Sequence, residues 1–181
     1  ALHAVQKAGK VRAYACSNWR VERLQAANDY AATIGAAGFT ASQVMWNLAV
    51  VDAETIGDPT IVVMDAAMHA YHCQTGLAAI PFSSQANGLF QKMAEGKFER
   101  LNRLHRRMYA SPENPRRLER ALALARECSL TLSQVVLGYL LAQPFVTIPI
   151  IGPRNSAQLT DSLSAADVQL TAEQVAYLEG K

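Results

Sequence analysis

The sequence predicts an α/β fold built from short parallel strands that alternate with amphipathic helices. Four apolar segments of strand length are separated by segments whose apolar residues recur every three or four positions. The second spacing is the period of a helix with one buried face. Parallel strands cannot be joined by a tight turn, so helices are the expected connections between them.

The first half of the chain alternates helix and strand three times. Gly9-Lys10 is expected to end the first helix, and Ser17-Asn18 to end the first strand. Either Ser17 or Asn18 could then cap the next helix. The predicted elements are a helix at 1–8, a strand at 11–16, a helix from about 21 to 34, a strand at 42–50, a helix from about 60 to 74 and a strand at 76–83.

The second half of the chain begins with a long irregular stretch and returns to the same alternation. One further strand is predicted there, between a pair of helices and two short helices. The predicted elements are an irregular segment from 85 to 114, helices at 116–127 and 131–143, a strand at 145–151, a short helix from about 156 and a last helix opened by Thr171.

Polar residues at the carboxyl ends of the strands favour a TIM barrel over a doubly wound sheet. They occur at Ser17-Asn18, at 82–85 and at 152–155. TIM barrels place their active sites on that face. No GxGxxG motif follows any strand, so a Rossmann cofactor site is not predicted.

Composition predicts one globular unit over residues 1–181. The chain is 50% hydrophobic and 18% charged, with a net charge of +2. The stretch from Lys92 to Arg120 nevertheless holds nine Lys and Arg against four Glu. Such a stretch could face a phosphate-bearing ligand or nucleic acid, although a solvated helix face is the commoner explanation. No aromatic residues are interleaved as in a nucleic-acid surface, so no nucleic-acid partner is predicted.

The three cysteines predict neither a disulfide framework nor a zinc site. Cys16, Cys73 and Cys128 are far apart and form no CxxC pair, and the cluster of His69, His72 and Cys73 lacks a second ligand pair. The cytoplasm fits this pattern best. No apolar run approaches the roughly 18 residues of a membrane span, and no signal peptide is recognised. The first residue is Ala, which suggests a processed or excerpted chain.

Four segments carry a family resemblance. They are GKVRAYACSNW (9–19), SQVMWNL (42–48), IPFSSQANGLF (80–90) and the long segment that begins IPIIGPRNSAQL (148–175). In this order and at this spacing they resemble the fifth to eighth strands and the final helix of the aldo-keto reductase family. The resemblance implies a TIM (β/α)8 barrel, of which residues 1–181 are the C-terminal, NADP-binding half with four βα units.

The resemblance implies a nicotinamide site at the ends of the first three predicted strands. Ser17, Asn18 and Gln43 correspond to residues that hydrogen-bond the carboxamide, which needs both donors and acceptors. Phe82 corresponds to an aromatic ring that stacks on the nicotinamide. Considered without the family, Gln43 could be a polar residue inside the barrel, and Phe82 an ordinary core residue.

A pyrophosphate site is implied in the loop after the third predicted strand. Small and polar side chains there let backbone N–H groups approach a phosphate. Without the family the segment would be an ordinary glycine-containing loop. The residues assigned to this site are Ser83, Gln85, Asn87 and Gly88.

The loop after the fourth predicted strand resembles the family's binding site for the adenosine 2′-phosphate. Gly152 and Arg154 match this loop, and a guanidinium offers a planar fork to phosphate oxygens, which favours NADP over NAD. Without the family, Arg154 would be a solvated surface residue. Gln158 and Asp161 match adenosine-contacting positions, whereas Ser162 stands where many family members have Asn.

No catalytic residue is assigned in this chain. Family members reduce aldehydes or ketones with a hydride from the cofactor and a proton from a Tyr supported by Lys, Asp and His. The segments that carry those residues are not found, and the pair Asp65 and Tyr71 has the wrong spacing. The sequence therefore predicts a fragment or truncated form of an NADP-dependent reductase. A non-catalytic nucleotide-binding or structural half-barrel is the alternative.

Half a barrel would leave an unpaired edge at each end of its sheet, at 11–16 and at 145–151. We expect these edges to be covered by a missing N-terminal half-barrel or by self-association. In the intact enzyme the further partner would be a small-molecule carbonyl substrate.

Overall fold

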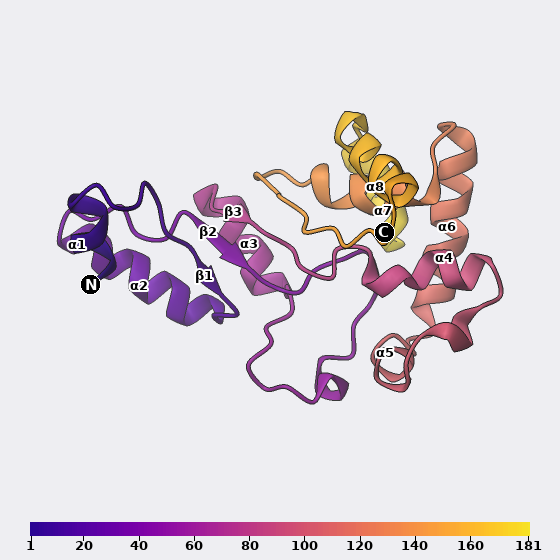
Figure 1. The fold of residues 1–181 in the computed structure, drawn as a ribbon, viewed down its shortest axis with the longest axis horizontal. Coiled ribbons are helices and arrows are strands. Elements are labelled where there is room, and N and C mark those ends of the chain that lie inside the picture. The colour runs from indigo at the N-terminus through magenta and orange to yellow at the C-terminus, as the bar shows by residue number, and fades with distance from the viewer.

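A three-stranded parallel sheet lies near the middle of an elongated molecule (Figure 1). The structure is a computed structural model that describes residues 1–181. Strand β2 lies between β1 and β3, and the register pairs Ser42 with Cys16 on one side and with Ala79 on the other. Helices connect each strand to the next, as parallel strands require. The strands are β1 (Cys16–Ser17), β2 (Ala41–Gln43) and β3 (Ala78–Ala79).

Helices make up most of the regular structure. α2 connects β1 to β2, α3 connects β2 to β3, and α4 to α9 gather at one end of the molecule (Figure 1). No helix has both the length and the hydropathy to cross a lipid bilayer. The helices are α1 (Leu2–Lys7), α2 (Val21–Thr33), α3 (Ala66–Thr75), α4 (Leu89–Ala94), α5 (Arg103–Met108), α6 (Glu113–Glu127), α7 (Leu132–Leu141), α8 (Ser156–Leu163) and α9 (Ala172–Glu179), with 3-10 turns at Ala53–Ile56, Ala86–Gly88, Phe98–Arg100 and Ser164–Asp167.

The predicted alternation of helix and strand is confirmed, but the strands are shorter than predicted. Regular pairing covers only two or three residues of each of the first three. Beyond β2 the pairing continues as single bridges, from Met45 to Val63 on one side and to Phe82 on the other. The helices predicted for the regions of α2, α7, α8 and α9 begin within a residue or two of the expected positions.

The predicted fourth strand at 145–151 is wrong as a regular strand, although the segment does run parallel to β3. No strand lies on the outer side of the segment to complete a ladder, and Pro149, between the bonded Ile148 and Ile150, has no N–H to offer on that outer side. A single bridge joins Thr147 to Ala79. The bonds to β3 and the residues after it run from Ala79 N–H to Val146 O (2.9 Å), from Ile148 N–H to Ala79 O (2.9 Å) and from Ile150 N–H to Pro81 O (2.8 Å).

The helix predicted to begin near residue 60 begins only at Ala66. Asp65 caps it, because its carboxylate accepts a hydrogen bond from the Met68 N–H at 2.8 Å. The preceding residues run beside β2 instead, where the Met45 N–H donates to the Val62 carbonyl and Met45 O accepts from the Met64 N–H, both at 2.9 Å. Tertiary pairing overrides the local helical pattern here.

The irregular stretch predicted from 85 to 114 is also wrong, because it contains α4 and α5. Each has six residues, fewer than two turns, so no repeated apolar spacing could reveal it. Asn102 caps α5 by accepting from the His105 N–H at 2.8 Å. α6 likewise begins earlier than predicted, at Glu113.

Asn114, fully buried at the start of α6, ties that helix to the segment after β2. Its side-chain oxygen accepts from the Val50 N–H at 2.8 Å. Its amide group donates to the carbonyls of Val50 and Tyr109, both at 3.0 Å. These three bonds satisfy backbone groups that would otherwise lose their hydrogen-bond partners on folding.

Both edges of the sheet are open. β1 pairs only with β2, and the segment 145–151 has no partner beyond it. Alternate side chains of that segment, Val146, Ile148 and Ile150, are 60%, 55% and 43% exposed. A row of exposed β-branched side chains beside an unpaired edge is typical of a surface that another element covers.

Replacing Asn114 with Ala is expected to lower the free energy of unfolding by about 2–4 kcal/mol, because it leaves buried backbone groups without partners. Urea unfolding followed by circular dichroism would measure this loss. Asn102→Ala, which removes an exposed helix cap, is the control and should lose at most about 1 kcal/mol. Equal losses in both variants would contradict the assigned role of Asn114.

Burial of His72 is expected to make stability depend on pH. Its Nδ1 lies 2.7 Å from the Leu77 carbonyl, so this nitrogen carries the hydrogen, while the buried Nε2 has no acceptor. Burial lowers the pKa of His72 below its ordinary value of 6.5. The unfolded chain therefore binds this proton more readily than the folded chain.

The free energy of unfolding should accordingly be highest above pH 6.5 and fall as the pH drops from there through the lowered pKa of folded His72. His72→Gln should lose part of this pH dependence, whereas His3→Gln in α1 should keep it. Urea unfolding over a pH range from about 7.5 down to about 4.5 measures the difference. An unchanged pH dependence in His72→Gln would show that other groups cause it.

Candidate functional site

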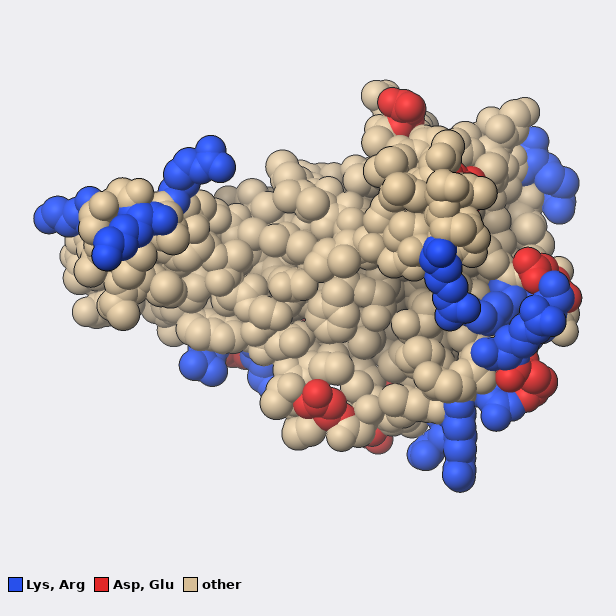
Figure 2. Space-filling view, viewed as in Figure 1, with Lys and Arg blue, Asp and Glu red and all other residues tan.

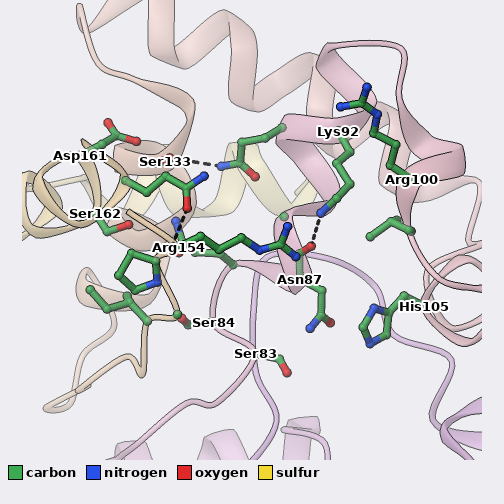
Figure 3. Close-up of a pocket in the computed structure, with 18 of the residues that line it drawn as sticks. Ser83, Ser84, Asn87, Lys92, Arg100, His105, Ser133, Arg154, Asp161 and Ser162 are labelled. Carbon is green, nitrogen blue, oxygen red and sulfur yellow. Dashed lines mark hydrogen bonds between the residues drawn. The ribbon is translucent and has the colours of Figure 1, made fainter. Parts of the chain in front are cut away.

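A cavity of about 920 Å³ lies between the loop that follows β3 and the loop that follows segment 145–151 (Figure 3). Its walls come from residues 83–105 and 150–162, with Ser133 of α7. Ser84, which is 1% exposed, joins the two loops because its hydroxyl donates to the Ile150 carbonyl at 2.6 Å. The cavity thus depends on the parallel course of β3 and segment 145–151.

Eight of the residues predicted for cofactor binding line this cavity. They come from two segments that are far apart in the sequence, the loop after β3 and the segment from Gly152 into α8. Their proposed contacts with a cofactor remain predictions. The eight are Ser83, Gln85, Asn87, Gly88, Gly152, Arg154, Gln158 and Asp161.

The loop after β3 has an unusual backbone. Ser83, Ala86, Asn87 and Gly88 have φ angles of 52°, 49°, 56° and 73°, in the left-handed region. Only Gly and, to a lesser degree, Asn adopt this conformation readily, so Ala86 in particular is strained. Turns of this kind gather backbone N–H groups into concave surfaces that bind anions. The strain is consistent with a binding role for the loop.

Side chains from three other elements hold this strained loop. The Asn47 amide donates to the Ser83 carbonyl at 3.1 Å, and the Lys92 ammonium donates to the Asn87 carbonyl at 2.6 Å. The Tyr109 hydroxyl donates to the Asn87 side-chain oxygen at 2.9 Å. Burial raises the pKa of Tyr109, which keeps this hydroxyl protonated as a donor.

The loop before α8 is fixed by a second set of hydrogen bonds. Asn155 caps α8 by accepting from the Gln158 N–H, and the Gln158 side chain accepts from the Arg154 N–H, both at 2.9 Å. Gln158 therefore positions Arg154. Gly152 has no left-handed φ, and a Cβ at this position would meet no atom within 4 Å, so neither the backbone nor packing requires glycine there.

The cavity carries more positive than negative charge. Glu95 is engaged by Lys97 at 2.6 Å, and the Asp161 carboxylate accepts from the Thr131 hydroxyl at 2.8 Å. Figure 2 shows Lys and Arg gathered at the end of the molecule that carries α4 to α6, with a smaller group at the opposite end. An anionic ligand fits this cavity better than a cation. The charged groups of the lining are Lys92, Lys97, Arg100 and Arg154 against Glu95 and Asp161, with His105 beside them.

Sequence reasoning did not assign Lys92, Arg100 and His105 to the site. The available signal was the excess of positive charge between Lys92 and Arg120, but a solvated helix face explained it equally well. The structure divides that stretch. Residues of its first part, from Lys92 to His105, line the cavity. Arg120 in α6 lies outside the cavity and pairs with Glu113.

The residues predicted for the nicotinamide do not line the cavity. Ser17 and Gln43 are direct neighbours in the register of β1 and β2, so both side chains lie on the same face of the sheet. Phe82 is bridged to Met45, two residues beyond Gln43, and therefore lies on that face as well. Phe82 directly precedes Ser83, which lines the cavity.

Asn18 has a structural role that the sequence did not indicate. Its φ of 56° is left-handed, and its side-chain oxygen accepts from the Val62 N–H at 3.2 Å. The alternative that Ser17 or Asn18 caps the following helix is wrong, because α2 has Arg20 at that position and no side-chain cap. Asn18 keeps its amide hydrogens free to donate.

Replacing Ser84 with Ala should lower the free energy of unfolding by about 1–2 kcal/mol, because the Ile150 carbonyl loses its partner. Ser83→Ala is the matched control, since Ser83 lines the same cavity and is held through its carbonyl, which the substitution leaves in place. Urea unfolding of both variants gives the comparison. If the two changed stability equally, the link between the loops would not depend on Ser84.

Comparisons with known proteins match the whole chain to one family. The model of the aldo/keto reductase family matches residues 1–181. The chain is 28% identical over 184 residues to the aldo-keto reductase ausK of Aspergillus calidoustus, covering 99% of this chain and 44% of that protein. It is 26% identical to the probable aryl-alcohol dehydrogenase AAD4 of Saccharomyces cerevisiae, and the match covers 98% of this chain and 53% of that protein. The chain thus spans about half the length of these relatives.

Solved structures give the same result for the fold. The thermostable aldo-keto reductase Tm1743 superposes with a TM-score of 0.64 at 18% identity, covering 99% of this chain and 52% of that one. The aldose reductase of Schistosoma japonicum gives 0.63 at 15% identity, with coverage of 99% and 44%. These likenesses support a TIM-barrel-like α/β fold. Together with the match over its full length, they show that the chain belongs to the aldo/keto reductase family.

Proposed function

We propose that residues 1–181 are the NADP-binding part of an aldo-keto reductase, whose intact form reduces aldehydes or ketones to alcohols. The observation that carries this proposal is the positively charged cavity between the two loops, with Arg154 free of any ion pair. A dinucleotide carries its phosphates as fixed negative charges, and unpaired Arg and Lys side chains suit them. The cofactor would supply a hydride to the carbonyl carbon.

The two ends of the cofactor would be held by different elements. Ser17 and Gln43, side by side on the sheet face, would bond the carboxamide, and Phe82 would pack on the nicotinamide ring. The strained loop at 83–88 would present backbone N–H groups to the pyrophosphate. Arg154, positioned by Gln158, would bind the 2′-phosphate.

The proton for the carbonyl oxygen would come from a residue other than those that hold the cofactor. We propose that a further set of βα units covers the exposed row at 146–150 and the free edge of β1, closing the barrel and bringing the proton donor to the sheet face. The support for this is the open edge at each side of the sheet, together with relatives about twice as long as this chain.

A second candidate is a nucleotide-binding module that works without the rest of the barrel. The observation in its favour is that the phosphate cavity is built entirely from residues 83–162 of this chain. This candidate requires the chain to bind NADPH in isolation. Calorimetry with millimolar NADPH and no detectable binding would remove it.

Replacing Arg154 with Ala is expected to weaken NADPH binding about tenfold and leave NADH binding nearly unchanged, since only NADPH has the 2′-phosphate. Isothermal titration calorimetry with both cofactors measures the ratio. Arg103→Ala, which removes the same charge outside the cavity, is the control. An equal loss of affinity for both cofactors would refute the assignment of Arg154.

A further inference from the structure

Lys92 folds back from α4 over the strained loop. Its ammonium donates to the Asn87 carbonyl at 2.6 Å. A Cβ placed on Gly88 would lie 2.8 Å from this ammonium nitrogen, so the glycine leaves the space that Lys92 occupies. Figure 3 shows Lys92 directed toward Asn87, with the Arg154 side chain reaching across the cavity toward the same place.

Neither Lys92 nor Arg154 has a carboxylate partner. The five ion pairs of the structure involve other cations. One of them joins the Lys97 ammonium to the nearby Glu95 carboxylate at 2.6 Å. Burial is the main cause that lowers the pKa of Lys92, the positive charge of Arg154 adds to it, and Glu95 opposes both more weakly. Two like charges facing each other without a counter-charge are unfavourable unless an anion binds between them.

We infer that Lys92 and Arg154 form a clamp for a single phosphate monoester, the 2′-phosphate of the nucleotide. This inference rests on the proposed function. A monoester carries between about 1.5 and 2 negative charges at pH 7 and has three strong acceptor oxygens. The guanidinium of Arg154 can bond two of them in a fork, and the ammonium of Lys92 can bond another.

The pyrophosphate is a poorer match for this pair of cations. Its two phosphates are linked on both sides, so each carries one charge, and backbone N–H groups of the 83–88 loop are available to it. A terminal phosphate concentrates its charge in one group. Two convergent cations without ion-pair partners suit that concentrated charge. Lys92 therefore acts together with Arg154 to select NADP over NAD.

The test compares adenosine 2′,5′-bisphosphate with adenosine 5′-monophosphate by calorimetry. Lys92→Gln should lower the affinity for the bisphosphate about tenfold and the affinity for the monophosphate less than about twofold. Lys92→Arg should recover part of the lost affinity, because it restores the charge. In the double variant with Arg154→Ala the loss should be smaller than the product of the single losses, since each cation positions the same phosphate for the other.

The control is Lys97→Gln, which removes the same charge from the same cavity but from a lysine already paired with Glu95. Lys97→Gln should lower the affinity for the bisphosphate less than about threefold. Circular dichroism and thermal unfolding of each variant establish that it is folded. An equal loss for both nucleotides in Lys92→Gln, or a loss no larger than that of Lys97→Gln, would overturn the inference.

Failure of the proposed function gives a different result. If the unmodified chain bound neither nucleotide, the nucleotide site itself would be wrong, and the role of Lys92 with it. The unmodified chain could instead bind the bisphosphate more tightly than the monophosphate, with the same ratio of affinities in Lys92→Gln. That result would refute the role of Lys92 and leave the nucleotide site intact.

Discussion

The parallel alignment of β3 with segment 145–151 is the constraint on which the candidate site depends. Three backbone hydrogen bonds set the relative position of these segments, and the Ser84 hydroxyl extends the contact to the Ile150 carbonyl. Because both segments run in the same direction, the loops that follow them emerge at the same edge of the sheet. Residues 83–92 and 152–162 therefore face each other across one cavity.

The cavity is assembled at a cost to local stability. Ala86 and Asn87 have left-handed backbones, and Lys92 and Arg154 lack ion-pair partners. Hydrogen bonds from Asn47, Lys92 and Tyr109 offset the backbone strain, but no carboxylate of the chain forms an ion pair with Lys92 or Arg154. Strained backbone beside uncompensated charge is the arrangement expected of a binding site rather than of a scaffold.

The open sheet follows from the same parallel topology. The backbone groups of each strand are hydrogen-bonded on the side where the chain supplies a neighbouring strand. The two outer edges of the sheet have no neighbouring strand. The exposed row of Val146, Ile148 and Ile150 is an apolar surface beside one of these open edges. The relatives described above are about twice the length of this chain.

The sequence by itself determined the features that depend on neighbouring residues. The spacing of apolar side chains located α2, Thr131 and Thr171 marked the starts of α7 and α9, and the resemblance to the aldo-keto reductase family assigned eight residues that line the cavity. Caps and helical periodicity act over one or two turns, so they can be read locally. Only the tertiary structure decided that segment 145–151 pairs without forming a regular strand, that Asn18 bonds Val62, and that Lys92 faces Arg154. The partners in these interactions are far apart in the chain, and the packing of the sheet and helices brings them together.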